Sequence, residues 1–221
     1  MRNLIIILSA FILNTGCGQT VTKNQDARFI EFINSFDEEK SKNILKFSRV
    51  VQKDKPMTKE EALRFVYHTD DTTVLYCPAV VFSMETEKIT GYYESLRMPD
   101  KSLLVDMQHY FLAGYTSFEC RAANPSNFSD IQYLHLFIIN KGYEVQDSLT
   151  VYRGDAYEDM VSGLLNPQNG KIFTLEESKS TMYVINKDLK FEIERERNDA
   201  PITNDFMKVL RILGWEEYFL E

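Results

Sequence analysis

The sequence predicts an α+β domain: a largely antiparallel, strongly bent β-sheet of about seven to nine strands, with N-terminal helices, one inserted helix and a C-terminal helix. Two observations carry this prediction. Residues 131–139 are apolar on both faces of a strand, and a turn and an alternating segment, residues 143–152, follow them. Segments rich in Val, Tyr, Phe and Thr fill most of residues 72–195, whereas helical periodicity is strongest near the two ends. A partly open barrel is an alternative shape for the same sheet.

The hairpin formed by residues 131–152 should lie at the centre of the sheet. A strand that is apolar on both faces is normally buried on both faces, so residues 131–139 should be an internal strand. Residues 143–152 alternate apolar and polar side chains, as a half-exposed strand does. Asn140 and Gly142 tolerate the positive φ values of short hairpin loops, and we expect them to form the turn with Lys141.

β-Branched and aromatic residues also mark the other strands. These strands are predicted at residues 73–84, 88–96, 102–108, 110–121, 171–175, 182–185 and 189–195, with an edge strand near residues 45–51. In the last of them, Lys190, Glu192 and Glu194 alternate with apolar residues. A charged outer face of this kind protects the edge of a sheet from further pairing.

The first helix is predicted at residues 26–36 by an apolar stripe at positions i, i+3, i+4 and i+7. The stripe consists of Phe29, Phe32, Ile33 and Phe36. Such a helix either docks on the core or lies in a membrane surface, and the absence of a Lys/Arg-rich polar face favours docking. A second helix should begin after Thr58, which can form a capping box with Glu61.

An inserted helix is predicted at residues 155–164, and a C-terminal helix is predicted after Thr203. The first would be capped by Asp155 and Glu158 and would bury Tyr157, Met160, Val161 and Leu164. The second would bury Phe206, Val209, Leu210 and Leu213. Gly214 is a natural left-handed stop, and Trp215 stands where a Schellman motif would fold it back on Leu210.

Residues 1–16 have the pattern of a secretory signal peptide. Arg2 supplies a positive charge, and the apolar run of residues 4–13 follows it. As a helix this run would rise about 15 Å, half of the roughly 30 Å hydrocarbon core of a bilayer, so it is too short to span a membrane. The small residues Thr15 and Gly16 then precede Cys17.

This start resembles that of a bacterial lipoprotein precursor, whose lipobox ends in a small residue and the cysteine that becomes lipidated. Asn14 departs from the pattern, because leucine is usual three residues before the cysteine. The resemblance implies that residues 1–16 are removed, that Cys17 carries acyl chains such as palmitate, and that residues 17–25 tether a single domain of residues 26–221. The residue that follows the cysteine is Gly18 rather than Asp. By the same resemblance, this implies sorting to the outer membrane of the cell envelope, on its periplasmic or its surface face.

Composition is that of one globular domain. The chain has 221 residues, of which 44% are hydrophobic and 26% are charged. No composition break or Gly/Ser linker divides residues 26–221, so one domain is the simpler interpretation. The formal net charge of −8 argues against nucleic acid and anionic lipid as partners, so we expect the lipid anchor rather than charge to provide membrane attachment.

Three histidines are candidate catalytic or metal-binding groups. His109 follows Asp106 by three residues, a spacing that could serve a base and its orienting carboxylate, but no nucleophile motif stands beside them. His135 lies in the most apolar strand, where a hydrogen-bonded core imidazole is the usual state. His68, followed by Asp70 and Asp71, marks either a cation site or a polar turn.

No metal and no cofactor is expected. The acidic run of Asp155, Glu158 and Asp159 lacks the alternating oxygen ligands of a calcium loop. Zinc requires three or four ligands at a recognisable spacing, and the sequence has no such cluster.

Cys77 and Cys120 both fall in predicted strands. In an exported protein they either form a disulfide or are two small buried apolar residues, and the sequence leaves both alternatives open. A disulfide between them would close a loop of about 44 residues and contribute roughly 4 kcal/mol in the chain-entropy model.

The densest group of aromatic residues is a candidate binding surface, because aromatic rings stack on sugars and grip extended peptides. The group consists of Tyr92, Tyr93, Tyr110, Phe111, Tyr115 and Phe118. The alternative is that these residues fill one face of the sheet.

The sequence therefore favours a membrane-anchored envelope lipoprotein that acts as a non-enzymatic binding or assembly module. Its expected partners are the membrane, through the lipid anchor, and an envelope protein or glycan. The alternative is an envelope hydrolase with a carboxylate site or an acid–base pair of Asp106 and His109.

Overall fold

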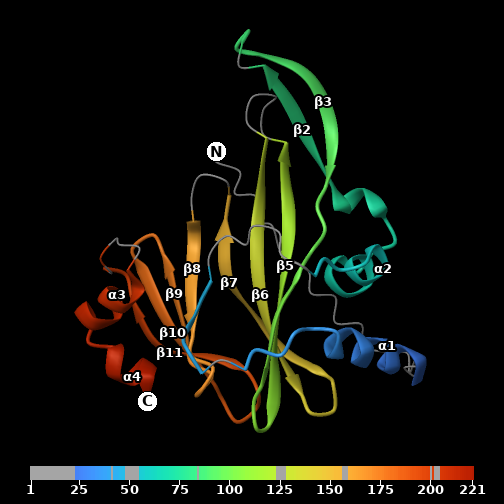
Figure 1. Cartoon of the computed structure of the whole chain (residues 1–221). Helices are drawn as coiled ribbons and strands as arrows, with labels where there is room; N and C mark the ends of the chain where they lie inside the picture. Colours follow the sequence, from blue (N-terminus) through green and yellow to red (C-terminus); the bar gives the residue numbers. More distant parts are fainter. Residues whose placement is uncertain are drawn as a thin grey trace, which may run out of the picture.

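The computed structural model describes residues 23–40, 42–47, 55–83, 85–122, 128–155, 159–199, 201 and 205–221. The expected signal peptide, Cys17 and most of the expected tether lie outside these residues. Within them the fold is α+β, and its main feature is an open, bent antiparallel sheet, as the sequence predicted (Figure 1). Among the described helices, none combines the length and the apolar character that crossing a bilayer requires.

The described strands form one large sheet and one separate hairpin. The large sheet contains β1 (Leu45–Phe47), β4 (Lys101–Asp106), β5 (Tyr110–Ala122), β6 (Phe128–Asn140), β7 (Val145–Gly154), β8 (Asp159–Leu165), β9 (Ile172–Glu176), β10 (Lys179–Ile185) and β11 (Phe191–Arg197). From β4 to β11 each strand pairs with the next along the chain, and β1 pairs with β8. The hairpin of β2 (Tyr76–Ser83) and β3 (Lys88–Leu96) extends beyond the end of the sheet (Figure 1).

The helices lie in two groups beside the sheet (Figure 1). The first group is α1 (Lys23–Asn34), α2 (Lys59–Glu61), the π-helix η1 (Ala62–Tyr67) and the 3₁₀ helix η2 (Thr72–Leu75). The second is α3 (Phe206–Ile212) and α4 (Glu216–Leu220). Because α1 begins at Lys23, the last residues of the expected tether are already helical.

β6 is an internal strand that is buried on both faces, which confirms the prediction for residues 131–139. Leu136 and Ile138 belong to the core inside the bend of the sheet, whereas Ile139 belongs to the core under α1. The expected turn also forms, but its left-handed residue is Tyr143, with φ 63°. The side-chain oxygen of Asn140 instead accepts hydrogen bonds from the backbone N–H groups of Gly142 and Glu144, at 2.9 and 3.0 Å.

The helix predicted at residues 155–164 is wrong, because residues 159–165 form β8. Leu164 packs under α3, while its neighbour Leu165 packs inside the bend. A strand that is buried on both faces carries consecutive apolar residues, and these can imitate a helical stripe. The capping box expected for this helix involves Glu158, which lies outside the described residues.

β8 changes its neighbour on one side along its length. Near its start it pairs with β7, where Gly154 lies opposite Asp159. Further along it pairs with β1, where Phe47 lies opposite Gly163. β1 therefore joins the sheet at the place where β7 has left β8. Among the described strands it pairs with β8 alone, as the edge strand predicted near residue 45 would.

The bend brings β11, one end of the strand order, beside β7 in its middle. The backbone N–H of Phe191, in β11, donates to the Asp147 carboxylate, in β7, at 2.9 Å, and the Lys190 ammonium donates to the Gln146 carbonyl. Side chains from β1 and from strands β4 to β9 form one core inside this bend. A second core lies between the sheet and α1 with η1, and a third lies under α3 and α4.

Two of the predicted helix-capping motifs form, and a third is replaced. Thr58 and Glu61 form the predicted capping box at the start of α2. At the end of α3, Gly214 has φ 68° and the Trp215 N–H donates to the Leu210 carbonyl at 2.7 Å, which is the predicted Schellman motif. The predicted cap at Thr203 is wrong: the N-cap of α3 is Asp205, whose carboxylate accepts a hydrogen bond from the Lys208 N–H. Thr203 itself lies outside the described residues.

Candidate functional site: an apolar pocket between α1 and the sheet

A pocket of about 460 Å³ lies between α1, η1 and the outer face of β5 and β6. Small-molecule sites commonly have volumes of about 300–1,000 Å³. Its lining is largely aromatic and aliphatic and comprises Phe29, Phe32, Ile33, Phe36, Arg64, Phe65, His68, Ala113, Tyr115, Phe137, Ile139 and Val145. Its size and lining make it the candidate functional site.

The helical wall of the pocket is the apolar stripe of α1. Phe32, Ile33 and Phe36 are buried, so α1 docks on the protein core, as the sequence favoured. Phe65 of η1 stacks on Phe32 with ring centroids 4.5 Å apart, which ties the two helices together across the pocket.

The sheet wall consists of neighbouring side chains on β5 and β6. Tyr115 stacks on Phe137, with centroids 4.7 Å apart and an interplanar angle of 16°. Ala113 lies opposite Phe137 in the strand register and is much smaller than the rings around it. Burial raises the pKa of Tyr115 to about 12, so its hydroxyl stays protonated at neutral pH and can serve as a hydrogen-bond donor.

The polar part of the pocket comes from η1 and its C-terminal turn. Arg64 and His68 line the apolar pocket and also a neighbouring hollow of about 650 Å³, which is lined further by Glu60, Leu63, Thr69 and Asp70. His68 has a left-handed backbone, with φ 51°, and its N–H donates to the Leu63 carbonyl, which closes the last turn of the π-helix. Local π-helical turns occur often at functional sites.

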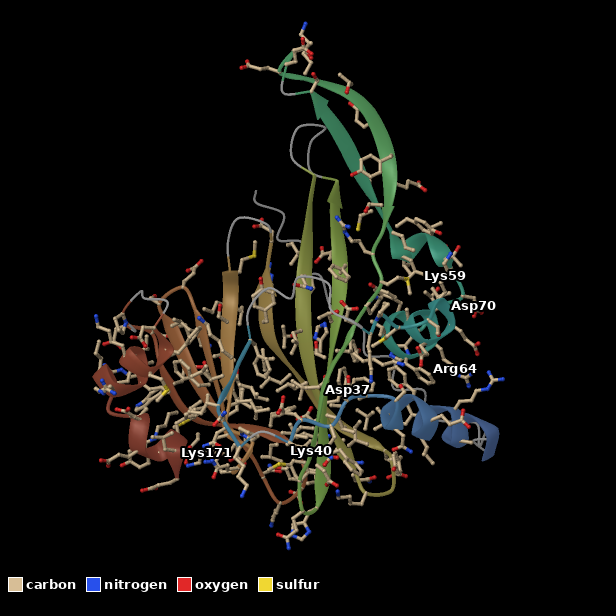
Figure 2. The ribbon with its side chains drawn as sticks, viewed as in Figure 1. Asp37, Lys40, Lys59, Arg64, Asp70 and Lys171 are labelled. Atoms are coloured by element: carbon tan, nitrogen blue, oxygen red, sulfur yellow. The ribbon has the colours of Figure 1, made fainter. Side chains whose placement is uncertain are left out.

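Arg64 lies on the side of η1 that faces α1 (Figure 2), and it lines the polar hollow together with Asp70. Its guanidinium carbon lies 5.7 Å from the centroid of the Phe65 ring. Arg28, on α1, forms an ion pair with Glu60 at 3.0 Å. Arg64 forms no ion pair with any residue that the structure describes. Its guanidinium is therefore available to a ligand at the border of the two hollows.

The structure does not join Asp106 and His109 as an acid–base pair. The Asp106 carboxylate binds the Lys141 ammonium, which also lies 3.7 Å from the centroid of the Phe111 ring. Asp106 and His109 are both described, and no hydrogen bond links them. His109 is exposed in the turn between β4 and β5.

His135 is a hydrogen-bonded core imidazole, as predicted. Its Nε2 lies 2.9 Å from the Ser117 hydroxyl and its Nδ1 lies 3.0 Å from the Thr150 hydroxyl. The ring stacks on Tyr133 with an interplanar angle of 8°. Burial lowers the pKa of His135 to about 4, which keeps the ring neutral at physiological pH.

The group of His68, Asp70 and Asp71 is a polar turn. Asp71 caps η2 by accepting hydrogen bonds from the Thr73 N–H and hydroxyl, and these bonds lower the pKa of its carboxyl. Across the described residues, no group of three His, Cys, Asp or Glu side chains is arranged to hold a metal ion. Of the predicted acidic run, Glu158 and the side chain of Asp159 lie outside the described part.

The predicted aromatic surface is divided among three places. Tyr92 and Tyr93, on β3, are 67% and 52% exposed, away from the pocket. Phe111 and Tyr115 pack in the core under α1, whereas Tyr110 packs against the core inside the bend. The sixth residue, Phe118, is half-buried, and its N–H donates to the Tyr67 hydroxyl at 3.3 Å. Tyr115 is the member of the group that lines the pocket.

Cys77 is disulfide-bonded. This observation agrees with the alternative in which cysteines pair, and the β2 strand that carries Cys77 contacts β5, which carries Cys120. The side chain of Cys120 lies outside the described part, so its pairing with Cys77 stays a prediction.

Sequence reasoning found the α1 stripe and the apolar faces of β6, but it missed Arg64 and the pocket itself. The spacing of Leu63, Arg64 and Phe65 resembles any amphipathic helix, and nothing in it indicates that Arg64 borders a cavity. Fold and site together define an α+β protein with an apolar pocket between a bent antiparallel sheet and its N-terminal helices. Comparison with models of known protein families, with curated proteins and with solved structures finds no match in any of the three.

Proposed function

We propose that this protein is a lipid-anchored binding module of the bacterial cell envelope and that the pocket between α1 and the sheet is its ligand site. The observation that carries the proposal is the apolar pocket of about 460 Å³ with Arg64 at its border. Several of the aromatic residues in its walls stack on one another, yet together the walls leave a space of ligand size.

The proposed anchor is Cys17, with residues 1–16 as the signal peptide. Residues 18–22 separate Cys17 from the start of α1. Fully extended, that length of chain reaches at most about 18 Å. A lipid on Cys17 would therefore hold α1, one wall of the pocket, close to the membrane surface.

Intact mass spectrometry of the protein extracted from membranes tests the anchor. We expect a chain that begins at Cys17 and carries acyl chains, and we expect Cys17→Ser to be released from the membrane or to remain unprocessed. A chain that begins elsewhere and carries no lipid would contradict the anchor.

Binding of phenylnaphthylamine, a neutral apolar dye, tests the pocket. Ala113→Leu fills the space above β5, so dye affinity should fall by at least about tenfold. Ala27→Leu places the same side chain on the exposed face of α1 and should leave dye affinity unchanged. Val145→Trp, at the half-exposed rim, gives a second blocking variant if Ala113→Leu folds poorly. Unchanged dye affinity in a stably folded blocking variant would overturn this site.

In the described part of the chain, the acid–base pair on which the hydrolase alternative rests does not form. The Asp106 carboxylate is bound by Lys141, and His135 is held by Ser117 and Thr150. The non-enzymatic proposal therefore has the better support.

A further inference from the structure

We propose that the ligand of the pocket is an amphipathic monoanion: an alkyl chain that enters the apolar pocket and a singly charged acidic head that binds Arg64. This inference rests on the proposed function, because it assigns a chemical class to the ligand of the same site. The head could belong to a free carboxylic acid or to a membrane phospholipid, and the experiment below distinguishes these two sources.

The apolar residues that line the pocket are the reason to expect an alkyl chain in the ligand. The interior is lined by phenylalanine rings of α1 and η1 on one side and by Ala113, Phe137 and Ile139 on the other. No carboxylate is among the described residues that line it. Away from Arg64, His68 and the Tyr115 hydroxyl, a polar or charged group placed there would lose its hydration without gaining a partner, whereas each methylene of an alkyl chain gains from leaving water.

The position of Arg64 is the reason to expect an acidic head group in the ligand. Three exposed arginines bind carboxylates of the chain: Arg28 binds Glu60, Arg197 binds Asp199 and Arg211 binds Glu216. Arg64 has no such partner among the described residues and borders both the apolar pocket and the polar hollow. A guanidinium presents donors in a planar fork that matches a carboxylate or a phosphate ester.

The charges around the polar hollow favour a single negative charge. Glu60 and Asp70 line the hollow together with Arg64. Glu60 is already paired with Arg28, but Asp70 adds a negative charge on the same side. A dianion would be repelled more strongly than a monoanion, so a carboxylate or a phosphodiester fits better than a phosphate monoester.

Displacement of bound phenylnaphthylamine from the full-length protein tests the inference. The competitors are decanoate, decanol and decylamine, which share one chain and differ in the charge of the head. Because hydrogen bonds to a charged group are strong, decanoate should bind about tenfold to a hundredfold more tightly than decanol, and decylamine should bind most weakly. Phosphatidylglycerol vesicles form a second arm: displacement by decanoate alone identifies a free acid, and displacement by vesicles alone identifies a membrane lipid.

Variants of Arg64 separate the contribution of the acidic head to ligand affinity from that of the alkyl chain. Arg64→Gln should bring decanoate affinity down to that of decanol, while Arg64→Lys should keep part of the difference. Arg28→Gln is the matched control and should keep the whole difference, because Arg28 is paired with Glu60.

The two proposals fail in different ways. If dye binds and decanol displaces it as well as decanoate does, or if Arg64→Gln changes nothing, the anionic head is wrong and the pocket stands. If decylamine is preferred, the charge is wrong. If the dye does not bind and no alkyl compound binds by calorimetry, the proposed function itself fails.

Discussion

The imidazole of His135 is held neutral on the helix-covered face of the sheet. Burial lowers its pKa to about 4, below the value of about 6.5 in an unfolded chain. Between these pH values the unfolded state binds the proton and the folded state does not, so stability is present above about pH 6.5 and is lost as the pH falls toward 4.

The first prediction concerns this loss. On acidification from pH 7 to about 4.5, the wild type should lose about 2–3 kcal/mol more of its free energy of unfolding than His135→Gln, whose amide does not titrate. Urea unfolding at a series of pH values measures both. Parallel pH profiles for the two proteins would show that His135 does not contribute.

Asp100 should give stability the opposite dependence on pH: its contribution should become less favourable as the pH rises. Its side chain is 2% exposed, both carboxylate oxygens lack a hydrogen-bond partner, and desolvation raises the pKa of its carboxyl. Below the pKa of the unfolded carboxyl, both states bind the proton; as the pH rises, ionisation favours the unfolded state.

The second prediction is therefore a stabilising substitution. At pH 7, Asp100→Asn should raise the free energy of unfolding by about 1–3 kcal/mol, because it removes an unpaired buried charge, and the gain should shrink toward pH 4. Asp106→Asn, on the surface beside Lys141, should change stability by no more than about 1 kcal/mol. A loss of stability in Asp100→Asn at pH 7 would mean that the carboxylate has a partner in solution.

Gly163 controls how β8 fits into the sheet. A Cβ atom built at this residue would lie 2.7 Å from the Val151 carbonyl oxygen and 3.1 Å from the Phe173 carbonyl oxygen. Both atoms belong to backbone of neighbouring strands, which cannot move aside as a side chain can.

The third prediction is that Gly163→Ala destabilises the protein by about 1–3 kcal/mol or more, as overpacking does. Gly142→Ala, in the exposed turn, should cost far less, since the nearest atom to its new Cβ is the Asn140 side-chain oxygen at 3.2 Å. Chemical denaturation compares the two. Equal midpoints would contradict the role given to Gly163.

Individual strands were easier to predict than the place of β8. The strand at residues 88–96 was predicted with its observed ends, because it is rich in aromatic and β-branched residues and Pro99 and Asp100 follow it. β8 was predicted as a helix because its two faces enter different cores, so its periodicity carries no sign of a single buried face. For the same reason the pocket could not be predicted: Phe32 of α1, Ala113 of β5 and Ile139 of β6 meet only through tertiary packing.

At the scale of the whole molecule, the disulfide of Cys77 links the predictions made for the three cysteines of the chain, because it needs one of the other two as its partner. If Cys17 carries lipid, Cys120 is the remaining partner. The fourth prediction is that peptide mapping without reduction finds Cys77 linked to Cys120 and that reduction costs about 2–4 kcal/mol of stability. A Cys17–Cys77 link would contradict both this pairing and the lipid anchor.

The pairing of β1 with β8 also has a consequence for the order of folding. From β4 to β11 each strand finds its partner next to it along the chain, so these hairpins close short loops. β1, in contrast, has no strand to pair with until the chain has been made as far as Leu165. Synthesis proceeds from the N-terminus, so α1 and β1 emerge first but can dock only after the meander that receives them exists. The segment nearest the proposed anchor therefore waits for strands made later: α1 needs β5 and β6 to complete the pocket, and β1 needs β8.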